Sequence, residues 1–477
     1  MSGSRPSIRA QGSQATRIAM AYGLIAIALI AVGMLQSWNV MFSMLHLCII
    51  SAVMALGVNM QWGYAGLFNA GIMGFAALGG LTAVLATFLP VGDAWEAAGA
   101  SVWVFFGSIL VAVGLGVGAL RFMPKGRNRA WVVGLISVVG FFVARWFYFQ
   151  ATPLIEAVNP AGTGFLGGIG IYAWLPGWAV FASFLVFLLG GVVAAGAAFL
   201  VGKLTLGLRS DYLAIATLGI SEIIIFFLKN EEWLTRGVKN VTTLPRPIWE
   251  PVDLINAPWF RDFATGWFGG NATDEQIRSA GSLVVKFGYT GLFLVVLVVI
   301  FLLAQRALNS PWGRMMRAIR DNEVSANAMG KNIVGRHLEV FVLGSAVVGI
   351  AGAMLTTVVG QFTPTEYIPM RFTFLIWVMV IVGGSGNNFG SILGGFLIWF
   401  VWIQAEPFGT WFMNIFVYSD DGETLRAYMF GNADLAQHLV DVAPQMRLML
   451  MGIVLLLVLR FSPAGILPEV VPGQKAK

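Results

Sequence analysis

The sequence predicts an all-α membrane protein, a polytopic bundle of about 10–12 transmembrane helices, some of them broken or re-entrant. Of its 477 residues, 58% are hydrophobic and 11% are charged, whereas soluble domains carry about 25% charged residues. Apolar runs of about 20 residues, enough to cross a hydrocarbon core of roughly 30 Å, recur along the whole chain. The 58 glycines favour close packing and breaks, because glycine lets two backbones approach each other in lipid.

Twelve apolar runs are candidate spans, and the charges between them predict their orientation. The runs are residues 18–36, 40–58, 65–89, 101–121, 131–149, 178–201, 212–229, 282–304, 338–358, 371–383, 388–404 and 446–461. If the first run starts in the cytoplasm, the connections 121–130, 202–211 and 305–337 are cytoplasmic too. The first of these has four basic residues and no acid, and the last has six basic and two acidic residues. The positive-inside rule expects this placement of charge.

The alternation of cytoplasmic and external connections also divides the chain into tails, a permease domain and loops. It predicts a permease domain over 18–461, external loops at 230–281 and 405–445, and a cytoplasmic tail at 462–477. The basic N-terminal tail, 1–17, precedes an apolar run without a cleavage pattern, so we interpret that run as a retained span and both termini as cytoplasmic. The short runs on either side of GGSGNNFG, residues 383–390, can form a re-entrant hairpin without changing the parity.

The long cytoplasmic connection contains a predicted amphipathic helix over 311–329. Ser310 suits the cap, Pro311 suits the first turn, and Gly330 suits the end of a helix. At 100° per residue one face holds Met315, Ala318, Ile319, Ala326 and Met329, and the other holds Arg317, Arg320, Asp321, Val324 and Asn327. Such a helix either lies on anionic lipid or docks against a cytoplasmic partner. The small residues and mixed charges fit a protein groove better than a lipid surface.

Five stretches carry a resemblance to a known family. In chain order they are GYAGLFNAGIMGF (63–75), LRSDYLAIATLGISEII (208–224), LTRGVKNVTTLPRP (234–247), AIRDNE (318–323) with the small residues that follow it, and VMVIVGGSGNNFGSILGG (378–395). Together they resemble the permease subunits of ATP-binding-cassette (ABC) importers for branched-chain amino acids and urea. The chain is similar to the larger of the two permease types of such an importer, with a type II-like permease fold.

The resemblance implies an ATP-driven importer that carries branched-chain amino acids, or related small polar solutes, from periplasm to cytoplasm. The alternative cargo is urea or a short-chain amide. The implied partners are two ABC ATPase subunits, a second homologous permease subunit and a periplasmic substrate-binding protein, in the bacterial inner membrane with its lipid. The resemblance also gives the loop helix the role of coupling to the ATPase. The coupling residues are then Ala318, Arg320, Asp321, Glu323, Ala326, Ala328 and Gly330.

The chain itself shows no nucleotide site. Only Lys203 and Lys331 follow a glycine, and neither fits the G-x-x-x-x-G-K-[ST] pattern. We therefore expect a transporter subunit and not an enzyme, without a cofactor of its own, and with ATP and magnesium bound by the partner subunits.

Two glycine-rich breaks and one acid are candidates for the translocation pathway. The candidates are Gly63, Gly66, Asn69, Gly71, Glu222, Gly383, Gly384 and Gly386. Broken helices at membrane depth either pack in protein or line a cavity, and half-helix N-termini near Gly66 and Gly384 suit a carboxylate. Close helix packing explains most of these glycines equally well. Glu222, the one acid between 212 and 229, must face protein or water, as a structural partner or as part of the route.

Other function classes fit less well. The formal charge of +6 is placed in short loops, as a membrane protein requires, so it does not indicate nucleic acid. The histidines, His46, His337 and His438, are too scattered for one metal site. A secondary transporter needs ion-coupling carboxylates within its spans, and the spans offer little beyond Glu222. A membrane enzyme needs a cluster of His, Asp or Cys on one side, which the sequence lacks.

Overall fold

The computed structural model describes residues 8–158, 165–268, 273–417, 441 and 445–469, with the backbone alone over 8–14 and 413–417. In this part of the chain the regular secondary structure is helical apart from an isolated β-bridge between Val241 and Phe362. Nine of the described helices are long and apolar enough to cross a membrane, and α3 and α16 are shorter apolar helices. The predicted all-α, multi-pass membrane fold is confirmed.

The helices follow the predicted spans closely. The long ones are α1 (Ile8–Leu35), α2 (Trp38–Asn59), α4 (Gly92–Phe122), α5 (Arg127–Ala157), α7 (Ala179–Thr205), α8 (Ser210–Asn230), α12 (Asp274–Asn309), α15 (Ile333–Val359) and α17 (Asn388–Val417). The shorter ones are α3 (Ile72–Thr87), α6 (Ile171–Trp174), α9 (Glu232–Thr235), α10 (Pro251–Asn256), α11 (Pro258–Trp267), α13 (Pro311–Asp321), α14 (Glu323–Ala328), α16 (Pro369–Gly383) and α20 (Met446–Phe461).

Helices α2 and α15 form the centre of the bundle, and α3, α7, α12, α16 and α17 pack around them. Glycines make the closest of these contacts. A Cβ added at Gly79 on α3 would lie 2.6 Å from the carbonyl carbon of Gly349 on α15. The backbones therefore touch, as expected of small residues in membrane helix packing.

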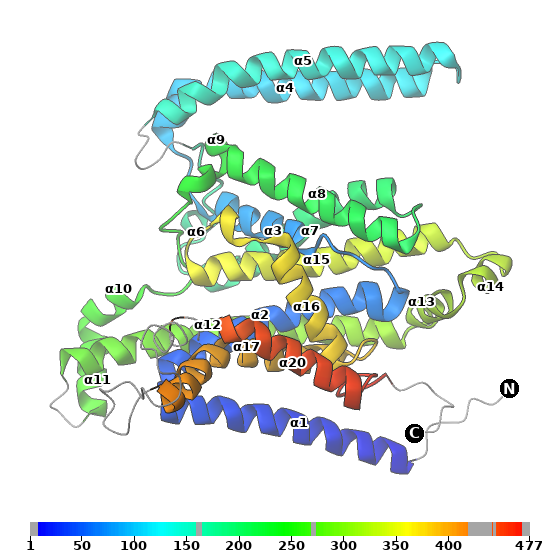
Figure 1. The fold of residues 1–477 in the computed structure, drawn as a ribbon. Helices are drawn as coiled ribbons and strands as arrows, with labels where there is room; N and C mark the ends of the chain where they lie inside the picture. The colour runs from blue at the N-terminus through cyan, green and yellow to red at the C-terminus, as the bar shows by residue number, and fades with distance from the viewer. Residues whose placement is uncertain (1–7, 159–164, 269–272, 418–440, 442–444, 470–477) are drawn as a thin grey trace.

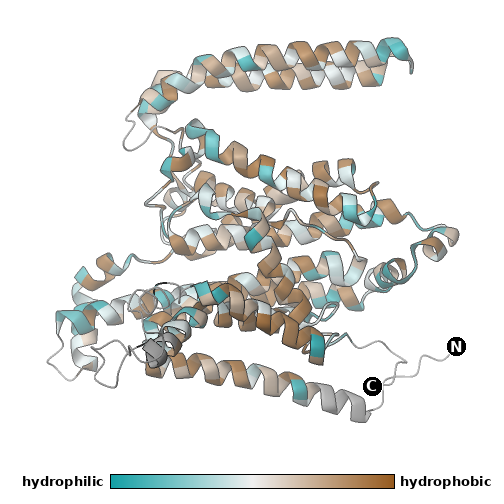
Figure 2. Cartoon of the chain, in the orientation of Figure 1, coloured by the Kyte–Doolittle hydropathy of each residue, from teal (hydrophilic) through white to brown (hydrophobic). Residues whose placement is uncertain are grey.

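The hairpin of α4 and α5 stands apart from this bundle (Figure 1). The two helices pack mainly on each other, and an apolar cluster that includes Val102, Ile155 and Trp233 joins their ends to the remainder of the chain. Both helices are coloured mostly hydrophobic in Figure 2, as lipid-facing helices would be.

The connections with basic residues lie at one end of the bundle (Figure 1). This end, which we call the basic end, holds the α4–α5 turn, the α7–α8 turn and the loop with α13 and α14, while α10 and α11 lie at the opposite end. The three connections that were predicted to share one side of the membrane therefore lie at the same end of the bundle. The tails at 1–7 and 470–477, and the greater part of the predicted loop 405–445, lie outside the described residues.

Two sequence predictions about helix boundaries are wrong. The predicted span 65–89 begins only at Ile72, because α2 continues as a π-helical turn over Met60–Tyr64 and a segment without regular structure, 66–71, follows it. The predicted helix 311–329 is two helices. Asn322 is extended, with φ of −159°, and its side chain accepts a 2.9 Å hydrogen bond from the amide of Ser325, which caps α14.

Candidate functional site

The two helix breaks predicted from the sequence meet at the basic end of the bundle. Gly63, in the π-helical turn after α2, lies against Gly386, in the turn between α16 and α17. A Cβ added at Gly63 would lie 2.5 Å from the amide nitrogen of Gly386. Gly386 itself has a φ of +81°, which favours glycine. Close approach of two backbones therefore explains both glycines.

Asparagines hold the two breaks together. The Asn59 side chain accepts a 2.8 Å hydrogen bond from the amide of Gly386 and donates a 3.1 Å bond to Asn388 Oδ1. The Tyr64 hydroxyl also donates to Asn388 Oδ1, and the Asn388 amide donates to Gln305 on α12 at 2.9 Å. Asn59 and Asn388 are both buried. A fully bonded polar network of this kind fixes one arrangement of the breaks.

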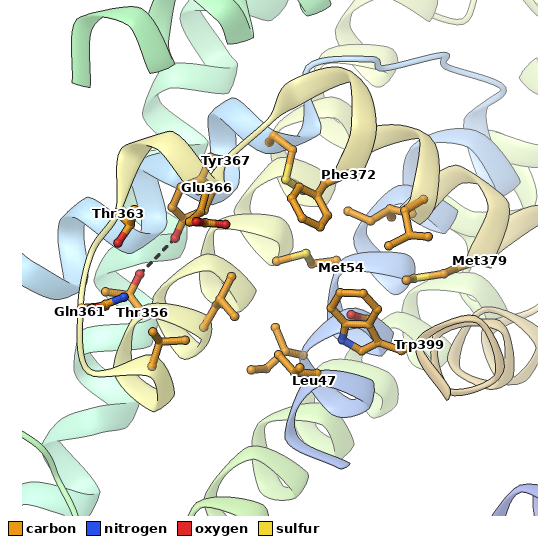
Figure 3. A pocket seen from close by; sticks show the side chains of 17 residues that line it. Leu47, Met54, Thr356, Gln361, Thr363, Glu366, Tyr367, Phe372, Met379 and Trp399 are labelled. Carbon is orange, nitrogen blue, oxygen red and sulfur yellow. Dashed lines mark hydrogen bonds between the residues drawn. The ribbon is translucent and has the colours of Figure 1, made fainter. Parts of the chain in front are cut away.

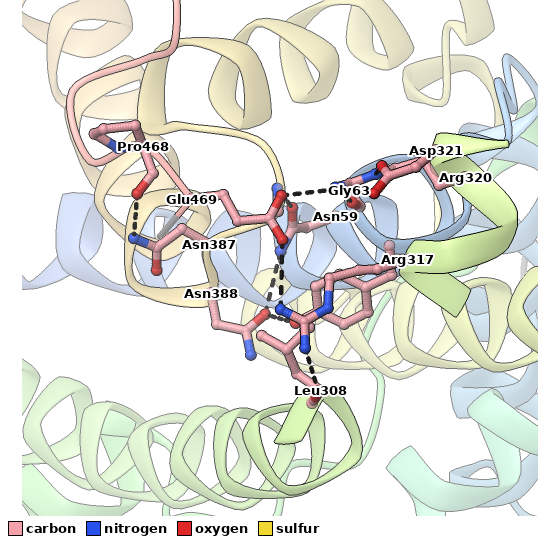
Figure 4. Close-up of polar contacts among 12 residues, drawn as sticks. Asn59, Gly63, Leu308, Arg317, Arg320, Asp321, Asn387, Asn388, Pro468 and Glu469 are labelled. Atoms are coloured by element: carbon pink, nitrogen blue, oxygen red, sulfur yellow. Dashed lines mark hydrogen bonds and ion pairs between the residues drawn. The ribbon is translucent and has the colours of Figure 1, made fainter. Parts of the chain in front are cut away.

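The loop helix α13 is tied to this junction by charge. The Arg320 guanidinium donates to the carbonyl of Gly63 and, at 2.9 Å, to Glu469 Oε2. Arg317 Nη1 lies 3.7 Å from Glu469 Oε1. The Arg320 and Glu469 side chains are 23% and 15% exposed, so the pair is shielded from solvent on most sides. Helix α13 therefore contacts the α2 break directly (Figure 4).

Glu469 belongs to the segment after α20, and sequence reasoning missed it. This segment packs on the second break, because the amide of Leu467 donates to the carbonyl of Gly383 at 2.9 Å and Asn387 donates to the carbonyl of Leu467 at 3.1 Å. One signal was available: Glu469 is the one acid among residues 462–477, on the side of the membrane where basic residues gather.

The face prediction for the loop helix is right for Ile319, which is buried, and wrong for Arg317 and Arg320. The buried residues of α13 are Gly313, Met316 and Ile319, and the arginines assigned to the outer face turn inward to Glu469. The break at Asn322 changes the faces of the later residues only, whereas Arg317 and Arg320 precede it and turn inward because Glu469 lies there.

The tip of the loop faces away from the chain. Of the predicted coupling residues, Ala318, Asp321, Glu323, Ala328 and Gly330 are exposed, Ala326 is half-buried, and Arg320 faces the junction. Two apolar side chains at the tip, Val324 and Met329, are 81% and 79% exposed. An apolar surface on an otherwise polar loop is typical of an interaction site.

The first break is satisfied within the protein. The buried Asn69 side chain donates to Gln61 Oε1 at 3.0 Å and accepts from the amide of Gly71 at 2.8 Å. The Trp377 indole donates to the Asn69 carbonyl at 3.1 Å, and Thr217 Oγ1 accepts from the amide of Ala70 at 3.1 Å. Irregular backbone at membrane depth requires such partners.

Backbone conformation or close packing explains the remaining glycine candidates. Gly66 and Gly384 have φ values of +72° and +118°, and Cβ atoms added at Gly71 and Gly383 would lie 3.0 Å and 2.7 Å from carbonyl carbons of neighbouring helices. The amides expected to serve a carboxylate near Gly384 are occupied: the amide of Gly386 donates to Asn59. At the first break Gly66 N donates to the carbonyl of Trp62 at 2.9 Å.

Glu222 lies apart from both breaks. It is in the middle of α8, on an exposed face with Ile215, Gly219, Ile223 and Phe226, and it makes no ion pair with any described residue. The neighbouring Ser221 is the residue that faces the bundle, where its hydroxyl accepts a 2.8 Å bond from the amide of Gly74. A carboxylate on the outer face of a spanning helix needs cover from outside this chain.

A cavity of about 330 Å³ opens between α2, α15, α16 and α17, and no motif in the sequence predicted it. Its polar residues, including Thr356, Gln361, Thr363 and Glu366, gather at one end (Figure 3). Tyr367 joins them, and its hydroxyl lies 3.1 Å from Thr356 Oγ1. Burial raises the pKa of Tyr367 to about 12, so the phenol stays neutral. The other walls are mostly apolar.

Comparison with known proteins gives a family match over most of this architecture. A family model described as branched-chain amino acid transport system / permease component matches residues 161–459, more than half of the chain. The matched region includes α7, α8, the loop with α13 and α14, and the second break.

Named relatives agree with the family match. The high-affinity branched-chain amino acid transport system permease proteins LivM of Salmonella typhimurium and Escherichia coli are each 29% identical over 231 residues, 48% of this chain. The aligned region spans half the length of those relatives. The probable branched-chain amino acid transport permease protein LivM of Methanocaldococcus jannaschii is 26% identical over 365 residues, covering 74% of this chain and 88% of that protein. No solved structure matches the chain.

Proposed function

The chain belongs to the family of permease components of branched-chain amino acid transport systems, and we propose that it is the membrane-spanning permease subunit of an ATP-driven importer for these amino acids. The observation that carries the proposal is the junction at the basic end, where α13 is ion-paired to Glu469 and bonded to the carbonyl of Gly63. A force applied to α13 reaches both helix breaks through these contacts. The chain is then a transporter subunit, and hydrolysis takes place elsewhere.

The partners follow from what the chain exposes. We assign two ATPase subunits, which bind ATP and magnesium, to the basic end, because Val324 and Met329 present apolar surface there. A periplasmic substrate-binding protein is assigned to the opposite end, where Trp249, Trp259 and Trp267 are exposed around α10 and α11. An interfacial aromatic belt remains the alternative role of these tryptophans.

The orientation proposed is that of the positive-inside rule, in the bacterial inner membrane. The basic end is cytoplasmic, and so are both termini. Grouping of the basic connections at one end of the bundle supports this orientation (Figure 1). The residues of the coupling loop then lie where a cytoplasmic ATPase can reach them.

Transport measurements test the proposed cargo. In vesicles that contain the complete importer, radiolabelled leucine should accumulate on addition of ATP and binding protein, and excess unlabelled leucine should suppress at least about nine-tenths of that signal, since competition at roughly tenfold above half-saturation leaves about a tenth. Urea should neither accumulate nor compete. The alternative, a urea or short-amide importer, predicts the reverse: ATP-dependent urea uptake that leucine does not inhibit.

The outer face of α8 supports the second permease subunit. Leaving the Glu222 carboxylate in lipid would cost about 2.5–3.5 kcal/mol on insertion scales, so a neighbouring protein or an aqueous route must cover it. A homologous permease packed on α8 would cover Glu222 with protein. If the translocation route runs between the two subunits, it would also place Glu222 beside that aqueous route.

Photo-cross-linking checks this assignment. In a Cys48→Ala background, a benzophenone attached to Gly219→Cys should cross-link the second permease, because Gly219 lies beside Glu222 and has open space around it. Gly196→Cys on α7 is the matched control, since Gly196 is also open, and its adducts should be with lipid. Lipid adducts alone from Gly219→Cys, with the second permease present, would contradict the assignment.

A further inference from the structure

The cavity between α2, α15, α16 and α17 has two chemically different ends. At the polar end Glu366 is exposed and makes no ion pair with a described residue, and Gln361 is exposed beside it. Thr363 Oγ1 is buried without a hydrogen-bond partner among the described residues. A carboxylate, an amide and a hydroxyl group that are free to bind a ligand therefore lie together at this end (Figure 3).

The other end is mostly apolar, and the one unpartnered buried polar atom among its described residues is Trp399 Nε1. Met54 on α2, Leu375 and Met379 on α16 and Trp399 on α17 line it, and Figure 3 shows Met54, Met379 and Trp399 on the far side from the polar residues. Methionine side chains adapt to ligands of varied shape, because they are unbranched and polarizable. A ligand that enters here needs an apolar part directed inward.

The polar end is also the side from which an imported molecule arrives. Residues 361–367 follow the end of α15 that points away from the basic end (Figure 1). A cation stands beside this mouth, because a Cβ added at Gly360 would lie 2.7 Å from Arg246 Nη2. The mouth therefore combines a carboxylate, neutral donors and a nearby guanidinium.

We propose that this cavity binds the transported molecule before translocation, and that its ligand is a zwitterionic α-amino acid with an apolar side chain. The ligand's ammonium pairs with Glu366, its carboxylate accepts from Thr363 or Gln361, and its side chain lies between Met54, Leu375 and Met379. The inference rests on the proposed function and adds the binding site. It also favours an amino acid over urea, because urea has no apolar part to fill the inner walls.

Protection from thiol modification tests the site. In vesicles with the complete importer and Cys48→Ala, we place a cysteine at Leu375, which lines the cavity, or at Phe374, its neighbour on α16, which is exposed outside it. Millimolar leucine should slow N-ethylmaleimide modification of Leu375→Cys by about tenfold, the effect of roughly 90% occupancy, and leave Phe374→Cys unchanged. Urea at the same concentration should protect neither.

A second variant tests the role of Glu366. Glu366→Gln keeps the shape of the side chain but removes its charge, so the leucine concentration that protects Leu375→Cys should rise about tenfold. Modification without leucine should stay the same. Phe372→Cys, which lines the cavity as well, replaces Leu375→Cys if that variant does not transport.

The outcomes separate this inference from the proposed function. Leucine uptake by the vesicles without leucine protection of either cavity cysteine would overturn the binding site and leave the importer assignment intact. Protection by urea instead of leucine would overturn the ligand class. Vesicles with the unsubstituted permease that take up no leucine would overturn the proposed function itself.

Discussion

Replacing Arg320 by glutamate is expected to reduce leucine uptake by at least about tenfold while the permease still inserts and still binds its ATPase subunits. Arg320 is bonded to the Gly63 carbonyl and to Glu469, and both contacts would become repulsive. Breaking a fully buried ion pair costs about 3–5 kcal/mol. Because the two side chains are 23% and 15% exposed, we expect roughly 2 kcal/mol, enough for a shift of more than tenfold in an equilibrium.

Arg314→Glu is the matched control for this prediction. Arg314 is on the same helix and has the same charge, but it is exposed, and its one hydrogen bond to a described residue goes to the carbonyl of Asn309, at 3.2 Å. ATP-driven uptake, ATPase activity and co-purification are measured for both variants. Equal losses of uptake in Arg314→Glu and Arg320→Glu would show that total charge, and not the junction, matters.

A charge exchange sharpens the test. Combining Arg320→Glu with Glu469→Arg restores an ion pair of opposite sense, so uptake should recover in part. Recovery should stay incomplete, because Arg317 lies 3.7 Å from the present Glu469 and would then face a second cation, and because the Gly63 carbonyl loses its donor. A double variant no better than the single ones would contradict a direct pair.

The sequence predicted the spans and the start of the loop helix because these depend on neighbours along the chain. Hydrophobic runs locate the helices, and the Ser310 side chain accepts from the amide of Gly313 at the predicted cap, with Pro311 in the first turn. Gly330 has the left-handed φ, +74°, that its place after α14 suggests. These predictions therefore depended only on residues that are close together in the sequence.

The junction could not be predicted in the same way. Arg320 faces inward because Glu469, 149 residues later in the sequence, packs beside it. No helical wheel contains that information. The helical wheel placed Arg320 on the face opposite the apolar residues, and that residue turns inward because an opposite charge from a distant segment is partly buried nearby.

The role of Asn69 also depends on contacts that the sequence does not show. Its polarity and its place among glycines indicated a ligand contact, but Gln61 and the Gly71 amide occupy its side chain. A polar residue in a broken membrane helix is needed first to satisfy the freed backbone. The cavity, in contrast, is built from α2, α15, α16 and α17, so no single stretch of sequence encodes it.

The second large loss of transport is expected from substitutions at the tip of the coupling loop. Met329→Asp or Val324→Asp should abolish co-purification of the ATPase subunits and reduce uptake to background, with the permease present in the membrane at normal levels. Both side chains are almost fully exposed here, so neither change disturbs the fold of this chain. A central apolar residue of an interface contributes about 2–4 kcal/mol, and placing an unpaired carboxylate there adds a desolvation cost.

Leu208→Asp provides the control, because Leu208 is an exposed apolar residue in the α7–α8 turn, at the same end of the bundle but outside the loop. It should retain the ATPase subunits and most of the uptake. The contrast with Arg320→Glu separates two steps: the tip variants lose the partner, whereas the junction variant keeps the partner and loses transmission. Retention of the ATPase by Met329→Asp and Val324→Asp would mean that the apolar tip touches lipid, the other role that an amphipathic loop helix can have.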